Sequence, residues 1–189
     1  MQHTGVAPRT DTRSRVQKVA LELFAEQGYE KTSLREIAER LGVTKAALYY
    51  HFRSKEDIVH SFTDDHYARL DGLIDWAKTQ PPGEQTRHEM LTRYVGIVFG
   101  GVEVFRFIEQ NRAAMQTLES KGDRMARFRS RLDTMVDLLT GPDAPLRTRV
   151  RAAAALISVS ATCMVVWDSV HDPAELQAIA LELATDITD

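Results

Sequence analysis

The chain has 189 residues, of which 43% are hydrophobic and 27% charged, and a formal net charge of −3. This composition supports a hydrophobic core and excludes a disordered chain. The single cysteine, Cys163, cannot form a disulfide within the chain, so we expect a protein of the reducing cytoplasm. The longest uncharged stretch, residues 152–167, is shorter than the roughly 20 residues of a membrane span, so we expect no membrane contact.

Positive charge is concentrated near the N-terminus. Residues 1–55 hold ten Lys/Arg against six Asp/Glu, a net charge of +4, which leaves −7 for residues 56–189. A basic segment joined to an acidic remainder suits a protein that places one end on a polyanion. An asymmetry of this size also arises by chance, so the charge pattern needs a second, independent signal.

Apolar residues recur at helical spacing in almost every segment, beginning with a helix over about 13–27 that ends at Gly28. A second helix opens at Ser33, which forms a capping box with Glu36, and ends at Gly42. Thr44 caps a third helix that runs to about Phe52. Longer helices follow, at about 55–79, 84–98, 104–118, 124–139, 145–169 and 173–187. The sequence therefore predicts an all-α fold of about nine helices.

Residues 33–55, SLREIAERLGVTKAALYYHFRSK, predict a helix-turn-helix motif. Gly42 tolerates the positive φ of a tight turn, and Val43 fills the angle between the two helices. Leu48 and Phe52 hold the second helix on the core. Its outer face then presents polar, small and aromatic groups suited to phosphates and base edges: Thr44, Lys45, Ala46, Tyr49 and Tyr50. The alternative is that Tyr49, Tyr50 and His51 only complete a helical core.

The segment from Val16 to about Ile58 resembles the tetracycline-repressor (TetR) family of bacterial regulators. The matching motifs are Ala20-x-x-Leu23-Phe24, Gly28-Tyr29, Thr32, Ile37-Ala38, Gly42-Val43, Leu48-Tyr49-x-His51-Phe52 and Ser54-Lys55. The resemblance implies an N-terminal three-helix DNA-binding domain over 1–55 and a C-terminal helical ligand-binding and dimerisation domain over 56–189. It further implies a homodimer on a near-palindromic double-stranded DNA operator, a small-molecule effector, and repression as the default.

The same resemblance assigns roles to individual residues of the motif. Lys45, Ala46 and Ala47 match the base-reading start of the recognition helix, and Arg35 matches a position that can reach a base. The phosphate-contacting positions are matched by Thr32 or Ser33 and by Thr44, Tyr49, Tyr50, His51 and Lys55.

The predicted helix over 145–169 is apolar on two opposite faces, so we expect it to be sandwiched. One face would cover its own domain, and the other would meet a partner chain. In the resembled family the last two helices pair with their symmetry mates, which implies an isologous interface. The expected interface residues are Val150, Ala153, Ile157, Ala161, Met164, Leu176, Ile179, Ala180 and Leu183. The alternative is a fully buried core helix in a monomer.

The resemblance also implies a ligand cavity in the C-terminal domain. Its candidate lining residues are Phe62, His66, Tyr67, Trp76, Tyr94, Phe99, Phe107, Met115, Met164 and Trp167. Ordinary core packing is the alternative for each of them. His66 is a candidate polar contact for a ligand or a surface histidine. Cys163 is expected to be an inert core thiol, with oxidant sensing as the alternative.

Enzyme signatures are missing from the sequence: it has no C-x-x-C pair and no glycine-rich phosphate loop. His88-Glu89 begins like a zinc-protease helix, but Thr92 stands where the second histidine would be. We therefore expect a protein that is not an enzyme and that carries no cofactor and no metal site. The alternative to small-molecule control is a C-terminal domain that binds another protein.

Overall fold

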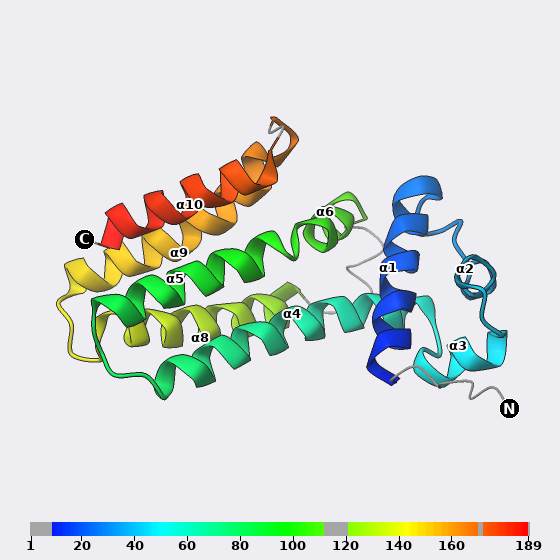
Figure 1. Cartoon of the computed structure of the whole chain (residues 1–189), viewed down its shortest axis with the longest axis horizontal. Coiled ribbons are helices and arrows are strands. Elements are labelled where there is room, and N and C mark those ends of the chain that lie inside the picture. Colours follow the sequence, from blue (N-terminus) through cyan, green and yellow to red (C-terminus); the bar gives the residue numbers. More distant parts are fainter. Residues whose placement is uncertain (1–8, 112–120, 170–171, 189) are drawn as a thin grey trace, which may run out of the picture. The chain divides into compact units, whose positions relative to one another are not determined.

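The computed structural model of the chain describes residues 9–111, 121–169 and 172–188 (Figure 1). Within these residues the chain forms nine α-helices and one short 3-10 helix, and no strand. The prediction of an all-α fold is therefore confirmed.

The chain divides into two compact units. The first, which we call the head, comprises Met1–Asp65 with Phe107–Leu118, and the second, the body, comprises His66–Arg106 with Glu119–Asp189. The boundary expected after Lys55 falls inside the head, because the first turns of the following helix pack with the N-terminal helices. The Nε2 atom of Gln17 donates to Ser61 Oγ at 2.8 Å and to Asp65 Oδ2 at 2.5 Å.

The head contains α1 (Arg9–Gln27), α2 (Leu34–Leu41), α3 (Lys45–His51) and the start of α4 (Lys55–Lys78). Its core is formed by residues from all four helices, each with a relative exposure of 6% or less: Val16, Ala20, Leu23, Phe24, Ile37, Ala38, Leu48, Phe52, Ile58, Val59 and Phe62. The apolar stripes of α1 and α2 thus bury the faces that their helical spacing predicts.

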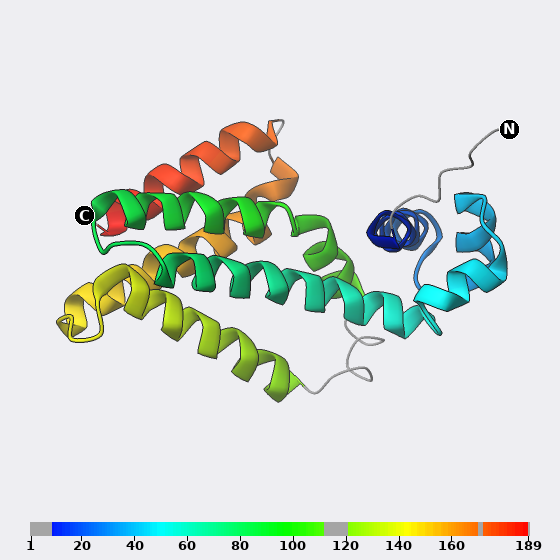
Figure 2. The same cartoon turned by 60° about the horizontal axis from the view of Figure 1, so that its bottom comes forward.

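The body contains the rest of α4, α5 (Glu84–Phe99), the first half of α6 (Val102–Gln110), α8 (Lys121–Thr140), α9 (Leu146–Val166) and α10 (Pro173–Thr188). A 3-10 turn, η1 (Trp167–Ser169), follows α9. In both views α5, α8, α9 and α10 run lengthwise side by side (Figures 1 and 2). The break predicted at Gly100-Gly101 separates α5 from α6. The predicted extension of α6 to Leu118 lies outside the described residues.

Polar side chains help to tie the helices of the body together. The buried hydroxyl of Tyr94 donates to the carbonyl of Leu156 at 3.1 Å and lies 3.1 Å from Ser160 Oγ. Arg131 on α8 donates from two nitrogens to the carboxylate of Asp71 on α4, at 2.9 and 2.8 Å. Such bidentate pairs fix orientation as well as distance.

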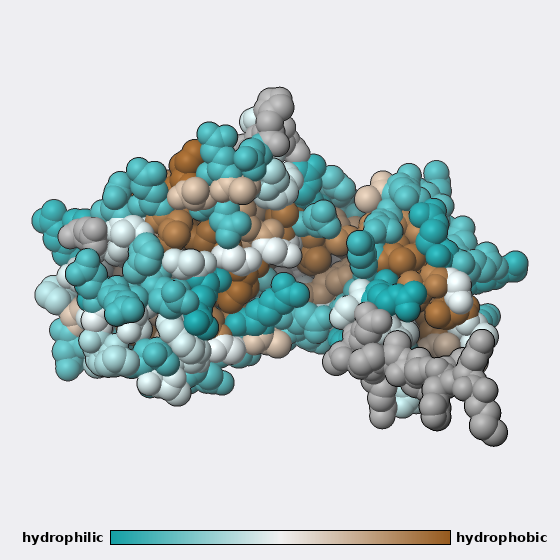
Figure 3. Space-filling view, viewed as in Figure 1, coloured by the Kyte–Doolittle hydropathy of each residue, from teal (hydrophilic) through white to brown (hydrophobic). Residues whose placement is uncertain are grey.

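The predicted two-faced character of α9 is confirmed. Leu156, Val159 and Cys163 are buried against the body, whereas Ile157 is 54% and Met164 60% exposed. By length and composition α9 would be long enough to cross a membrane, which is weak evidence for a span because its buried face belongs to the body core. Apolar surface continues onto α10 (Figure 3), and the exposed large apolar residues of the two helices are Leu146, Val150, Ile157, Met164, Val165, Val166, Ile179 and Leu183.

Two residues expected at a subunit interface lie in the core instead. Leu176 is 5% and Ala180 1% exposed, because this stripe of α10 faces α9 and α5 within the same chain. Ile179 and Leu183 occupy the outward stripe of α10. Ala153 is half-buried and Ala161 exposed on α9.

The residues expected to line a body cavity do not form one group. Tyr67, Tyr94 and Phe99 belong to the body core, with Trp76 and Trp167 packed against it. Phe62 and Phe107 lie in the head instead, where their rings contact each other and that of Phe107 stacks on Phe24. Met164 is exposed, so it does not line an interior cavity, and Met115 lies outside the described residues.

His66 makes the body sensitive to acid. Burial, followed by the positive charges of Arg69 and Arg131, lowers the pKa of its imidazole from 6.5 to about 4. The folded chain therefore keeps His66 neutral, while an unfolded histidine takes up a proton below about pH 6.5. The free energy of unfolding therefore has its full value, as far as His66 is concerned, above pH 6.5. It decreases as the pH falls from 6.5 towards 4, because the unfolded chain then binds the proton more tightly than the folded chain does.

We expect His66→Gln to flatten the fall in melting temperature between pH 6.5 and 4.5. After allowance for solvent screening of this half-buried group, we expect His66 to account for about 1–2 kcal/mol of the acid-induced loss in the free energy of unfolding. The matched control is His88→Gln, which removes an exposed histidine of α5. Identical acid profiles for the wild type and His66→Gln would contradict the assignment.

Candidate nucleic-acid interface

The start of α2 is fixed by the predicted capping box. Glu36 N donates to Ser33 Oγ at 3.3 Å, and Ser33 N donates to Glu36 Oε2 at 2.8 Å. The pKa of Glu36 is lowered chiefly by the Ser33 hydroxyl, which lies 2.8 Å from Glu36 Oε2, and next by the Ser33 backbone N–H. Because two backbone donors at the helix N-terminus are satisfied locally, the exposed Ser33 is held in one place.

The turn between α2 and α3 has the geometry that its sequence predicts. Gly42 adopts φ 71° and ψ 29°, in the left-handed region that glycine enters at low cost. Thr44 then caps α3, and its Oγ1 accepts from Ala47 N at 3.1 Å. The only side chain of α3 with no measurable exposure is Leu48, which anchors the helix to the core.

The outer face of α3 is open to solvent. Tyr50 is 67% and Tyr49 41% exposed, and Lys45, Ala46 and Ala47 are exposed as well. The interpretation of Tyr49 and Tyr50 as core residues is therefore wrong. His51 is half-buried and meets the ring of Tyr50 edge-on, with centroids 5.3 Å apart.

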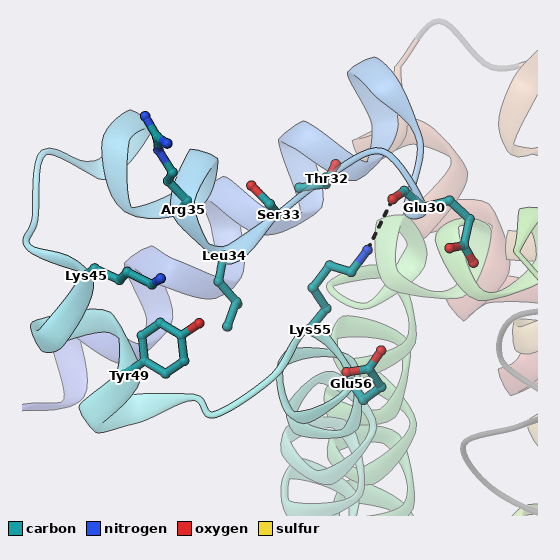
Figure 4. A pocket seen from close by; sticks show the side chains of 9 residues that line it. All are labelled: Glu30, Thr32, Ser33, Leu34, Arg35, Lys45, Tyr49, Lys55 and Glu56. Carbon is teal, nitrogen blue, oxygen red and sulfur yellow. Dashed lines mark hydrogen bonds between the residues drawn. The ribbon is translucent and has the colours of Figure 1, made fainter.

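Residues of α2, α3, α4 and the loop before α2 surround an open groove of about 490 Å³ in the head (Figure 4). Lys45 lies along its wall with Nζ 5.4 Å from the centroid of the Tyr49 ring. Arg35 on α2 forms an exposed ion pair with Glu39 at 2.7 Å, and such a pair exchanges its partner at little cost. The complete lining is Glu30, Thr32, Ser33, Leu34, Arg35, Lys45, Tyr49, Lys55 and Glu56.

Lys55 is engaged with the loop that precedes α2. Its Nζ donates to the carbonyl of Tyr29 at 2.7 Å and to that of Glu30 at 3.4 Å, and lies 4.4 Å from the centroid of the Tyr29 ring. An ammonium group has three N–H donors, so one remains for a phosphate. The sequence pattern contained no signal for the two bonds to the loop.

Thr32 lines the groove but is itself almost fully buried. Its side chain is 2% exposed, and its hydroxyl donates to the carbonyl of Gly28 at 2.8 Å. The Thr32 hydroxyl closes the turn after α1, so of the two alternatives for this phosphate contact, Thr32 and Ser33, the structure favours Ser33. Ser33, the next residue, is exposed and takes the place at the surface.

The site offers hydrogen-bond donors, two aromatic faces and cationic side chains, which is chemistry for an anionic polymer. Hydroxyl and ammonium groups contact phosphates, while lysine and arginine reach guanine edges in the major groove. Among the described residues no group of three or more His, Cys, Asp or Glu could hold a metal ion.

Comparison with known proteins points to the same segment. Residues 17–62 match the model of "Bacterial regulatory proteins, tetR family". The HTH-type transcriptional regulator AcrR of Shigella flexneri is 50% identical over 48 residues, which are 25% of this chain and 22% of AcrR. The HTH-type transcriptional repressor KstR2 of Mycobacterium tuberculosis is 29% identical over 116 residues, 60% of this chain and 52% of KstR2. The chain thus spans about half, or less, of the length of these relatives.

The likeness of fold extends through the body. A transcriptional regulator from Aquifex aeolicus superposes with a TM-score of 0.72 at 19% sequence identity, covering 93% of this chain and 99% of the other. Identity this low shows a shared fold alone, whereas the match of residues 17–62 covers the capping box, the turn and α3. Residues 17–62 of this chain therefore match the model of the tetR family of bacterial regulatory proteins, and the described residues share the fold of the Aquifex aeolicus regulator.

Proposed function

We propose that this chain is a cytoplasmic DNA-binding transcriptional regulator that acts as a homodimeric repressor on a near-palindromic operator. The observation that carries the proposal is the exposed face of α3, where Lys45, Tyr49 and Tyr50 project from a helix anchored by Leu48. Arg35 and Ser33, the N-cap residue of α2, extend the same surface onto α2. In this proposal α3 enters the major groove, and its neighbours contact the phosphates on either side.

Homodimer formation uses the outward apolar stripe of α9 and α10, which we call the dimer stripe: Val150, Ala153, Ile157, Ala161, Met164, Ile179 and Leu183. Five of these seven residues are large apolar side chains among the exposed ones of the chain. An apolar patch of this kind on a water-facing surface is typical of a protein interface. A two-fold arrangement would bring the same stripe of two chains together and present two copies of α3 to successive grooves.

Control by a small-molecule effector bound in the body completes the proposal. An effector releases DNA only by as much as its affinities for the two forms of the protein differ. The second candidate is control by a protein partner on the body surface. A panel of metabolites screened by melting temperature distinguishes the two. A small-molecule effector that binds tightly raises the melting temperature, whereas a body controlled by a protein partner shows no shift with any metabolite.

The experiment that tests DNA binding is selection of bound duplexes from random and genomic DNA by the purified full-length chain. We expect an inverted repeat with half-sites about one helical turn apart, or slightly more. If each head neutralises three or four phosphates, a dimer neutralises roughly seven, and affinity falls roughly 10³- to 10⁴-fold between 50 and 200 mM salt. Recovery of no common sequence at low salt would overturn the proposal.

A further inference from the structure

The loop Tyr29–Ser33, which links α1 to α2, carries part of the groove wall. Glu30, Thr32 and Ser33 line the groove directly. The loop contains no helix or strand of its own, so its position depends on the side chains that hold it. Lys55 bonds two of its carbonyls, and Thr32 closes its first turn through Gly28.

Tyr29 is the residue through which the loop enters the core of the head. Its side chain is 5% exposed, and its hydroxyl donates to Glu56 Oε1 at 2.9 Å. Burial and the nearby Glu56 carboxylate raise the pKa of Tyr29, so the hydroxyl stays protonated and remains a donor. Tyr29 therefore joins the loop to the first turn of α4 by its hydroxyl and to the interior by its ring.

The ring of Tyr29 meets two further aromatic rings. Phe24 on α1 lies edge-on to it with centroids 5.2 Å apart, and Phe107 on α6 lies 6.0 Å away. Phe107 also stacks on Phe24, with centroids 4.9 Å apart and an interplanar angle of 18°, and meets Phe62 at 6.4 Å. Phe107 is thus the one ring of this cluster that contacts the other three, and it comes from a distant part of the chain.

We propose that Phe107 is a positioning residue for the loop Tyr29–Ser33, and that it acts by holding Phe24 and Tyr29 in place. Aromatic pairs of this geometry contribute beyond the area that they bury, and removal of a buried ring leaves a cavity that the neighbours fill only in part. Loss of the Phe107 ring lets Tyr29 shift, which moves the carbonyl that Lys55 binds. The significance for DNA contact rests on the function proposed above.

The first test measures the loop without DNA, by hydrogen–deuterium exchange of the full-length chain. The Thr32 amide donates to the Tyr29 carbonyl at 3.3 Å, so its exchange reports on the loop directly. We expect Phe107→Ala, and to a smaller degree Phe107→Leu, to speed exchange at 29–33 by about tenfold or more. The matched control is Ile108→Ala, which removes a half-buried apolar residue of the same helix.

The second test measures affinity for the selected operator, with Lys55→Ala combined in a double-mutant cycle. We expect Phe107→Ala to weaken binding roughly tenfold and to make the slope of log affinity against log salt shallower by about one or two per dimer. A merely destabilised protein would lose active fraction and keep its slope. Since both residues act on one loop, the combined loss should be smaller than the product of the single losses.

Unchanged exchange at 29–33 in both Phe107 variants, or equal acceleration in Ile108→Ala, would overturn the positioning role. The positioning role would also be overturned if the loss of affinity in the double variant equalled the product of the losses in Phe107→Ala and Lys55→Ala. A wild-type chain that binds no duplex would contradict the proposed function instead, and the exchange experiment would still decide the role of Phe107.

Discussion

Substitution of Ile157 by aspartate is expected to convert the protein to a monomer and to weaken operator binding by roughly 10²- to 10⁴-fold. Ile157 is 54% exposed on α9, so the charged side chain costs little in the folded chain itself. In a two-fold interface the carboxylate occurs twice and is buried without a partner, which prevents association. Loss of the second head then removes the gain in affinity that comes from tethering two binding sites together.

Sedimentation velocity at micromolar concentration measures the first effect, and titration of the selected operator measures the second. Gln85→Asp is the matched control, because it adds the same charge at an exposed position in the first turn of α5. We expect the control to remain dimeric. An Ile157→Asp protein that sediments as the wild type does would show that the dimer stripe has another role.

The second large effect concerns sequence discrimination. We expect Lys45→Ala to reduce affinity for the operator about 10- to 100-fold while changing affinity for random duplex much less, because the proposed function places Lys45, at the start of α3, against base edges. Lys55→Ala is expected to weaken both duplexes alike, since Lys55 holds the loop Tyr29–Ser33 and offers its third donor to a phosphate.

The measurement is the affinity of each variant for the operator and for a scrambled duplex at one salt concentration. The ratio of the two affinities, compared with that of the wild type, reports sequence discrimination. Lys18→Ala serves as the control, because it removes an equal charge from an exposed position on α1 outside the groove. Equal losses on the two duplexes for Lys45→Ala would place base readout elsewhere.

Local chemistry explains why much of the head was predictable from its sequence. The capping box at Ser33, the glycine turn at Gly42 and the cap at Thr44 each depend on residues within four positions of one another. Such signals can be recognised without any tertiary information. The exposure of Tyr49 and Tyr50 was predictable for the same reason, because Leu48 and Phe52 are the residues that pack on the core and leave the other face of α3 to solvent.

Contacts between distant residues could not be predicted in the same way. Lys55 binds a loop 25 and 26 positions earlier in the sequence, and Phe107 joins the cluster of Phe24 and Tyr29 from α6. Residue type and spacing give no signal for such pairs. Phe107 was therefore expected in a body cavity, where an aromatic residue of α6 is equally plausible by composition.

Apolar periodicity has a related limit on α10. Leu176 and Ala180 form one apolar stripe and Ile179 and Leu183 another, and hydrophobicity alone does not say which stripe meets the chain's own core. The structure separates them: Leu176, Ala180 and Ala184 lie in the body core, whereas Ile179 and Leu183 are exposed.

The central claim is that the exposed face of α3 enters the major groove of duplex DNA, and methylation interference on the selected operator tests it directly. We predict that methylation of guanine N7, a major-groove atom, blocks binding at positions within each half-site, while methylation of adenine N3 in the minor groove does not. Interference confined to minor-groove positions, or none at either atom, would contradict it.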